Sequence, residues 1–436
     1  MTTFAALFVP PELRAAVSDQ AWLAAMLAAE RALVDAEAAA GVVPAHLAGE
    51  ISDRCRADLY DIEELCRDGV ATGNPAEPLV RAIRAGVSAE AAGYVHFGAT
   101  SQDIVDSAAM LVASRALGLI GGWLDEVAER CAGLAREHRL TPIAGRTLLQ
   151  QAVPTTFGLK AAGWLVGARG ARALVARVRE QRLRAQLGGA VGSLAALGER
   201  GPEVARLYAR ELDRGEPVAP WNTERIALIE LGAALAAAAA AAAKIATDIV
   251  LLAQTEVGEV REGAGGGSST MPHKRNPAIS VRALACAAKA RRDAGALIAA
   301  EPHQHERAAG PWHAEWDALT GALEATGGAV AAAAEALAGL EVDTARMRQN
   351  LDMTGGLIMA ERVAFAAAVG IGLVEAHRLV AAAAARTAGE GVSFRQTLVE
   401  SAGLGLSPDA IDAALDPATG LEPAAALVDR LLSGTA

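Results

Sequence analysis

From Ile226 to Leu252 the sequence reads IALIELGAALAAAAAAAAKIATDIVLL, with an unbroken alanine run over residues 236–243. Alanine has the highest intrinsic helix propensity, so the segment predicts one long helix. It is also long and apolar enough to raise the question of a membrane span. Because it carries Glu230, Lys244 and Asp248, and because alanine contributes little to membrane insertion, we expect a helix buried in a bundle instead.

Helical character extends along most of the chain. Hydrophobic residues make up 52% of the 436 residues but aromatic residues only 3%, so alanine and leucine supply most of the apolar surface. No alternation of apolar and polar residues is long enough to predict a β-strand, and the predicted fold class is all-α. Asp19 is the expected N-cap of the first long helix, and Ser101 and Asp103 are expected to cap another. Helices are expected at about residues 19–40, 58–66, 75–84, 101–136, 155–187, 222–260 and 278–300.

The helices become short after about Val342, with glycine breaks at 355–356, 389–391 and 403–405. This change predicts an N-terminal helical domain (residues 1–104), a central domain of long helices (105–342) and a small C-terminal helical domain (343–436). Long alanine-rich helices usually need partners to cover their apolar faces, so we expect an oligomer. A monomeric helical array is the alternative.

Charge and cysteine content limit the possible partners. The net charge of −11 and pI near 5.3 argue against nucleic acid, although a local group of cations can still bind an anionic substrate. The first residues show no signal peptide, and we expect a cytoplasmic protein that does not bind membranes. Four dispersed cysteines indicate neither disulfides nor a zinc site; they are Cys55, Cys66, Cys131 and Cys286.

The segment GGGSSTMPHKRNP, residues 265–277, carries the clearest chemistry. Its glycines let backbone amides approach an anion, its serines offer hydroxyls, and Lys274 offers a positive charge. Such a serine could be a nucleophile, an acid/base or part of a phosphate cradle. The order of residues fits neither a Walker loop nor a nucleophile elbow.

This segment resembles the signature loop of the fumarase/aspartase superfamily. Two further segments of that family appear in order: HFGATSQD at residues 96–103 and GRTLLQQAVPTTFG at 145–158. The resemblance therefore covers nearly the whole chain. It implies a central bundle of long helices, a homotetramer, active sites built from three subunits, and no cofactor or metal.

The resemblance also implies a set of site residues. Ser268 matches the residue that exchanges a proton with the carbon α to a carboxylate, and Lys274 and Asn276 match residues that hold that carboxylate. The aci-carboxylate formed by proton removal is doubly negative, and it needs cations and amide donors aimed at its oxygens. The implied catalytic residues are Ser268, Lys274 and His96, and the implied substrate-binding residues are Thr100, Ser101, Thr147, Gln150, Ser269, Met271, Asn276 and Arg307.

Leu148 departs from the pattern of the family's argininosuccinate and adenylosuccinate lyases, which have histidine there. Those enzymes expel a basic nitrogen that benefits from a positioned acid. Leucine supplies no proton, which favours a leaving group that departs as a stable anion, such as the carboxylate of a lactone. The alternative is that His96 does the acid's work.

Three further segments resemble the bacterial carboxymuconate cycloisomerases within the superfamily: residues 186–198, 303–316 and 341–352. That branch implies lactonisation of 3-carboxy-cis,cis-muconate, a small tricarboxylate, in protocatechuate degradation. Arg307 is the first candidate for an extra cation, and Arg146 and Arg348 are weaker ones. A surface or inter-helix ion pair is the alternative for each arginine.

His303, His305 and His313 are not expected to bind a metal, because residues i and i+2 on a helix point to different sides. His273 lies in the loop, where it either contacts substrate or fixes the loop. The rival functions are a nitrosuccinate lyase, which also releases a stable anion, an adenylosuccinate lyase, and an inactive structural relative.

Overall fold

A computed structural model describes residues 4–263, 266–267, 271 and 273–434. The chain divides into two compact units. The first unit comprises residues 1–125, 170–243 and 282–332, and the second comprises 126–169, 244–281 and 333–436. Long helices dominate the described residues, which confirms the all-α prediction.

The α-helices are α1 Ala5–Phe8, α2 Pro11–Ala16, α3 Asp19–Ala39, α4 Ala45–Arg54, α5 Ile62–Asp68, α6 Ala76–Ala85, α7 Ala89–Ala92, α8 Ser101–Glu137, α9 Phe157–Gln181, α10 Gly201–Glu211, α11 Ile226–Leu252, α12 Ala278–Ala299, α13 Pro311–Ala338, α14 Thr344–Asp352, α15 Ala360–Ile371, α16 Leu373–Glu390, α17 Phe394–Val399, α18 Pro408–Leu415 and α19 Glu422–Leu432. Short 3-10 turns are η1 Ala57–Leu59, η2 Gly69–Ala71, η3 Ala195–Arg200 and η4 Leu357–Met359. The strands are β1 Pro142–Thr147, β2 Gln150–Thr156, β3 Val260–Glu262, β4 Gly266–Gly267, β5 Arg275–Asn276 and β6 Leu340–Val342.

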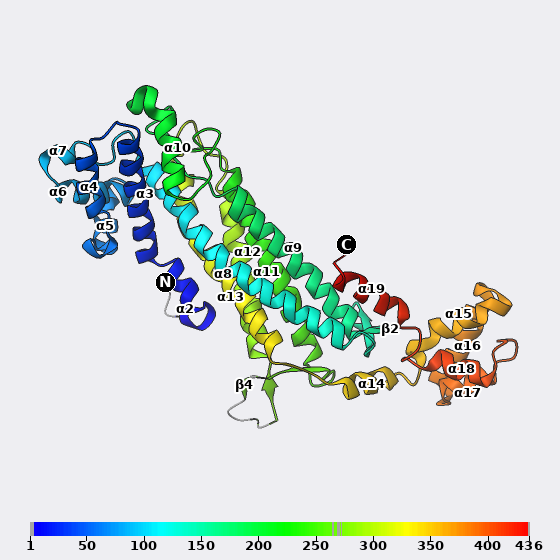
Figure 1. The fold of residues 1–436 in the computed structure, drawn as a ribbon. Coiled ribbons are helices and arrows are strands. Elements are labelled where there is room, and N and C mark those ends of the chain that lie inside the picture. The colour runs from blue at the N-terminus through cyan, green and yellow to red at the C-terminus, as the bar shows by residue number, and fades with distance from the viewer. Residues whose placement is uncertain (1–3, 264–265, 268–270, 272, 435–436) are drawn as a thin grey trace. The chain divides into compact units, whose positions relative to one another are not determined.

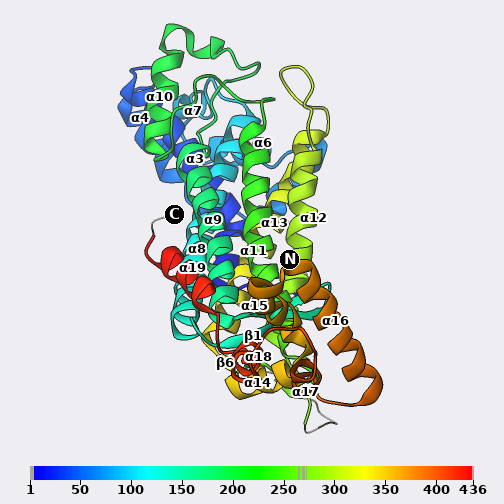
Figure 2. The same ribbon diagram turned by 90° about the vertical axis from the view of Figure 1, so that its right-hand side faces the viewer.

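In the first unit, α3 packs against α4 and α10 (Figures 1 and 2). The N-cap of α3 is Ser18, whose side chain accepts a hydrogen bond from the backbone N–H of Ala21. The prediction that Asp19 is the cap is therefore wrong by one residue. Asp19 instead begins the helix, where its negative charge complements the helix dipole.

Small residues bring the long helices of the first unit close together. A Cβ on Gly232 of α11 would lie 3.3 Å from the carbonyl oxygen of Ala294 in α12. A Cβ on Gly327 of α13 would lie 2.1 Å from Leu13, which leaves no room for a methyl group. The hydroxyl of Thr326 donates to the Leu235 carbonyl, which ties α13 to α11. Gly232 and Gly327 thus permit close packing of the helices in this unit.

By length and composition alone, α8 and α11 could each cross a membrane, and the bent pair Thr344–Asp352 with Leu357–Ile371 would make a third span. The most apolar window of α8 is 78% buried within the chain, and that of α11 is 50% buried. On α11, Asp248 accepts hydrogen bonds from the Trp164 indole and the Lys244 ammonium, both at 2.7 Å. Asp248 is therefore paired within the chain and does not face an apolar surrounding alone.

The segment 142–156 is a β-hairpin, so the expectation of no useful strand is wrong there. β1 and β2 pair antiparallel with a bulge beside Gly145, where a Cβ would lie 2.6 Å from the Val153 carbonyl oxygen. The two-residue turn is Leu148–Leu149, both with positive φ. The bulge and the prolines interrupt the usual alternation of apolar and polar residues in a hairpin. The turn has two leucines in place of the Asn-Gly pair that usually marks it. β3 pairs with β6, and β4 pairs with β5.

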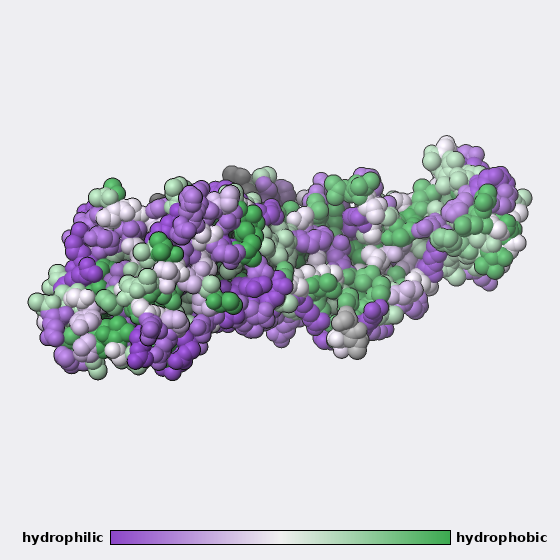
Figure 3. Space-filling model, turned by 90° about the horizontal axis from the view of Figure 1, so that it is seen from above, coloured by the Kyte–Doolittle hydropathy of each residue, from purple (hydrophilic) through white to green (hydrophobic). Residues whose placement is uncertain are grey.

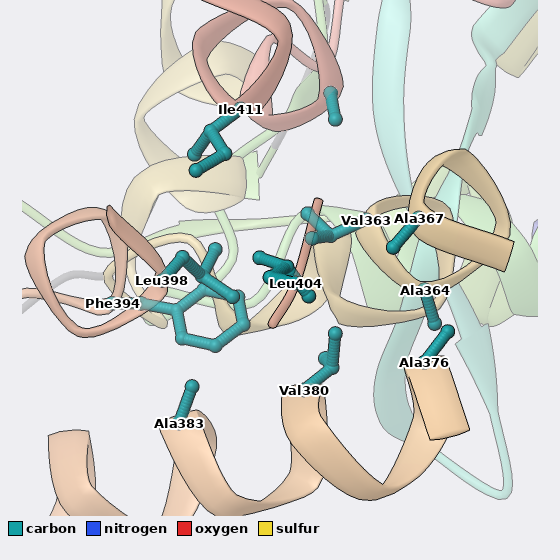
Figure 4. Close-up of a cluster of buried hydrophobic side chains, with 11 residues drawn as sticks. Val363, Ala364, Ala367, Ala376, Val380, Ala383, Phe394, Leu398, Leu404 and Ile411 are labelled. Atoms are coloured by element: carbon teal, nitrogen blue, oxygen red, sulfur yellow. The ribbon is translucent and has the colours of Figure 1, made fainter. Parts of the chain in front are cut away.

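In the second unit, α15–α18 enclose a compact core. Phe394 and Leu398 of α17 point toward Val380 of α16 and Leu404 (Figure 4), and each is at most 4% exposed. Figure 3 shows hydrophobic residues at the surface of the lobe at its right-hand end, which α15–α18 build. Val369 is among the exposed apolar side chains there, at 93%. The glycine breaks predicted beyond Val342 separate these short helices.

Replacing Phe394 by alanine should open a cavity in this core and cost about 3–5 kcal/mol locally. Hydrogen exchange by mass spectrometry should then show faster exchange over residues 360–415. Val369→Ala, at a 93% exposed position of the same unit, should leave the exchange unchanged. Equal protection in the two variants would contradict this description of the core.

Candidate active site

The start of α8 is held by the buried carboxylate of Asp103. It accepts hydrogen bonds from the backbone N–H groups of Thr100 (3.0 Å), Gly188 (3.0 Å) and Gly189 (2.9 Å). The side chain of Gln186 donates to it at 3.3 Å. Burial raises the pKa of Asp103 to about 7, while these donors act to lower it. Asp103, the third residue of α8, thus satisfies the backbone N–H of Thr100 just before the helix and also anchors a second segment, whereas Ser101, the other predicted cap, is the first residue of the helix.

That second segment is the glycine-rich stretch from Gln186 to Gly198. Gly189 has φ of 70°, and a Cβ there would lie 2.8 Å from the Gly98 carbonyl oxygen. Only glycine combines this backbone conformation with so close an approach. The two segments that resemble family motifs, 96–103 and 186–198, are therefore packed directly on each other.

Arg307 lies beside Thr100, so the structure brings two predicted substrate-binding residues together. Its guanidinium contacts the Thr100 hydroxyl, and its Nε donates to the Ala190 carbonyl at 3.0 Å. Ser101 follows as the first residue of α8, and all three side chains are half-buried. A cation fixed beside hydroxyls at a helix N-terminus suits a carboxylate.

A buried ion-pair network supports this end of the first unit. Arg225 is 2% exposed and pairs with Asp106 of α8 and Glu315 of α13. Asp106 also accepts from the Trp312 indole at 3.0 Å and from Gln102 at 3.1 Å. Burial acts to lower the pKa of Arg225, but the two carboxylates outweigh burial and raise it. No sequence motif indicated this network, because its members are far apart in the chain.

One group of the described residues has the spacing of a metal site. Candidate ligand atoms of Glu301, His303 and Glu315 lie within 4.8 Å of one another. Residues 301–310 are not helical, so the helical spacing argument against His303 and His305 does not apply. The guanidinium of Arg225, however, already donates to both oxygens of Glu315. A metal ion would have to bind next to that fixed positive charge.

His96 lies on the same motif as Thr100. Its Nδ1 is 2.6 Å from Oε1 of Glu30, a carboxylate on α3 that is 2% exposed. The His96 side chain is 13% exposed and its φ is 60°. The first unit thus contains His96, Thr100, Ser101 and Arg307 from the predicted site.

In the second unit, Thr147 and Gln150 face each other across the hairpin, next to its Leu148–Leu149 tip. The adjacent Arg146 pairs with Glu259, a carboxylate that is 0% exposed, at 2.7 and 2.9 Å. Arg146 therefore forms an ion pair within the chain, which was the alternative to its binding the substrate. Arg348 does too, because it pairs on the surface with Asp416 (3.2 Å) and Asp352 (3.6 Å).

Glu259 also accepts from Asn350 at 2.7 Å, and Gln151 donates to the Asn350 carbonyl at 3.0 Å. Asn350, in the stretch 341–352, therefore braces the hairpin close to its tip. Glu259 was not identified from the sequence, because its partner Arg146 lies 113 residues away.

The signature loop is anchored at both ends. Asn276 pairs with Gly266 across β4 and β5. The buried Glu262 accepts from the N–H groups of Ile279 (3.0 Å) and Ser280 (2.8 Å), which caps α12. A cavity of about 770 Å³ is lined by residues that include Lys274, Asn276, His273, Arg261 and Arg275. Met271 is 41% exposed, and Ser268 and Ser269 lie outside the described residues.

The sequence matches the models of known protein families. Residues 10–290 match the lyase family model, and residues 356–431 match the model of the adenylosuccinate lyase C-terminus. The chain belongs to the fumarase/aspartase superfamily. This confirms the resemblance seen in the three sequence motifs.

Named relatives in the superfamily cover the chain almost completely. A 3-carboxy-cis,cis-muconate cycloisomerase of Bradyrhizobium diazoefficiens is 46% identical, over 96% of this chain and 95% of that protein. A nitrosuccinate lyase of Streptomyces davaonensis is 43% identical, over 97% of this chain and 92% of that enzyme. The crystal structure of the 3-carboxy-cis,cis-muconate lactonizing enzyme from Pseudomonas putida superposes with a TM-score of 0.93 at 40% identity. The match covers 99% of this chain and 98% of that enzyme. Enzymes of the fumarase/aspartase superfamily are typically oligomeric and act on small carboxylate substrates.

Asp103→Ala should destabilise the first unit and disturb the contact of Thr100 with Arg307. It leaves buried donors without an acceptor, each at a cost of about 1–3 kcal/mol. The melting temperature should fall by several degrees. The control Asp125→Ala, on the same helix, removes a surface pair with Arg172 worth about 0–1 kcal/mol. Equal melting shifts in the two variants would show that Asp103 is no anchor.

Proposed function

We propose that this chain is a 3-carboxy-cis,cis-muconate cycloisomerase, an intramolecular lyase that forms 4-carboxymuconolactone. The observation that carries the proposal is its 46% identity, over 96% of the chain, to a relative of that name. Leu148 supports it independently, because the hairpin tip offers an apolar side chain where an amine-expelling lyase has an acid.

The proposed reaction adds a carboxylate oxygen of the substrate to a conjugated double bond. The C–O bond forms as the electron pair moves to the neighbouring carbon, α to another carboxylate, and gives an aci-carboxylate. Ser268 then gives its hydroxyl proton to that carbon and regains a proton from solvent. No group leaves the substrate.

In this proposal Lys274 and Asn276 aim a cation and an amide at the aci-carboxylate, the species whose charge must be stabilised. Both line one cavity in the second unit. Arg307 and Thr100 hold a further carboxylate in the first unit. Ser101, Thr147, Gln150, Ser269 and Met271 are proposed substrate contacts, and His96 is proposed as a further catalytic residue.

We further propose a cytoplasmic homotetramer with active sites shared between three subunits. The exposed side chains of α11 in its alanine-rich half include Ala233 and Ala240, so an apolar helix face is open in the single chain. Such a face gains stability when another helix covers it. No nucleic-acid or membrane partner, cofactor or metal enters the proposed reaction.

A nitrosuccinate lyase activity is the second candidate. The 43% identity to such an enzyme, over 97% of the chain, supports it. The two activities share the aci-carboxylate chemistry and a stable anion, carboxylate or nitrite, and they differ in whether that anion leaves the molecule.

The purified protein should rapidly remove the ultraviolet absorbance of the conjugated diene in 3-carboxy-cis,cis-muconate. Ser268→Ala should abolish this turnover and leave the oligomer intact, because the hydroxyl alone carries the proton. A parallel assay should measure nitrite release from nitrosuccinate. Nitrite release without loss of the diene would replace the first function by the second. Near-normal activity of Ser268→Ala would remove Ser268 from the mechanism.

Leu148→His should bring no rate gain with 3-carboxy-cis,cis-muconate, because a carboxylate needs no proton to act as a stable anion. Steady-state kinetics of the variant and the wild type would be compared at several pH values. A large gain in kcat would show that an acid at position 148 assists the reaction, and it would contradict this explanation of Leu148.

A further inference from the structure

Glu30 is a buried carboxylate in the middle of α3, facing His96. The two side chains are 2% and 13% exposed, and Oε1 of Glu30 lies 2.6 Å from Nδ1 of His96. Glutamate is almost never fully buried without a partner. The contact with His96 gives this acid a partner on the buried face of α3.

The same contact defines the chemistry of the imidazole. An ionised carboxylate only accepts hydrogen bonds, so Nδ1 of His96 carries the hydrogen. Nε2 is then the nitrogen left for another partner. The φ of 60° at His96 is rare for a residue with a Cβ and needs surrounding contacts to hold it. Glu30 supplies such a contact.

We propose that Glu30 is a positioning residue for His96: it accepts the Nδ1–H and favours the protonated ring, which then also presents Nε2–H to the substrate. This inference rests on the proposed function, in which His96 takes part in the reaction. Glu30 acts through His96 and does not itself touch the substrate.

Other charged groups surround His96 and act on the same ring. Burial lowers the pKa of His96, the carboxylates of Glu30 and Asp103 raise it, and Arg84 of α6 lowers it; the net pKa is raised. Tyr208 of α10 interacts with Glu30 and Asp103, and burial raises its pKa, so it stays neutral. A raised pKa keeps His96 charged to higher pH. Removal of the Glu30 charge should therefore let His96 lose its proton at lower pH.

Glu37 offers a matched control on the same helix. It is 0% exposed, and its carboxyl oxygens have no hydrogen-bond partner among the described residues. Burial, and then the charge of Glu30, raise the pKa of Glu37 to about 9. Its carboxyl group is thus protonated at neutral pH, and glutamine replaces it with a neutral group of the same shape.

The test compares Glu30→Gln with Glu37→Gln by measuring kcat/KM for the substrate across neutral and alkaline pH. Glu30→Gln should move the alkaline limb to lower pH and reduce kcat/KM by about 10- to 100-fold on that limb. Glu37→Gln should follow the wild-type profile. Glu30→Asp, which keeps the charge, should restore the limb toward wild type. If Glu30→Gln also follows the wild-type profile, the positioning role is wrong.

A second readout needs no turnover. Nuclear magnetic resonance of enzyme with carbon-13 at histidine Cε1 follows the titration of His96, and His96→Ala identifies its signal. The signal should titrate at lower pH in Glu30→Gln than in wild type. An inactive wild type in the diene assay would overturn the proposed function alone. An unchanged His96 titration in a folded Glu30→Gln would overturn this inference alone.

Discussion

The buried carboxylate of Asp103 is the interaction on which the first unit's part of the site depends. Taking this acid out of water is costly, and only a full set of donors offsets the cost. Three backbone N–H groups and the Gln186 amide supply that set. Because the donors come from both of the packed segments, one side chain fixes the start of α8 and the path of Gly188–Gly189 together. The carbonyls of Gly189 and Ala190 then hold Arg307 in place.

The second unit solves a similar problem with Glu259. This acid is also fully buried, and its oxygens accept from Arg146 and Asn350. The bulge interrupts the hydrogen-bond ladder of this hairpin, so a buried ion pair beside the tip helps to fix its orientation. Removal of one partner would leave the other charge buried and unpaired, which typically costs about 3–5 kcal/mol.

The sequence predicted the fold class and the long helices because alanine composition and glycine breaks are local signals. α12 was predicted to within one residue at its end, whereas α11 is shorter than expected and α13 was not delimited. The hairpin was missed because Gly145 and the Leu148–Leu149 turn carry no alternating pattern. The site motifs were found through their resemblance to a family. Their supports, Glu30 and Glu259, were not found, because they meet partners 66 and 113 residues away.

The hairpin tip links backbone strain to the choice of reaction. Leu148 and Leu149 have φ of 50° and 65°, and they are 97% and 74% exposed. Two branched residues in this conformation cost roughly 1–2 kcal/mol each, and asparagine or glycine would relieve the cost. Strained backbone of this kind is commonly found at functional sites, so we expect the apolar tip to have a role in the reaction. Under the proposed mechanism the tip supplies leucine, and no acid, because the attacking carboxylate needs no proton. The chemistry is then restricted to substrates whose departing or attacking group is already a stable anion. A tricarboxylate that lactonises meets this condition, and before ring closure it carries one carboxylate more than a succinate offers. Arg307, fixed against Thr100, is the cation that we propose to bind it.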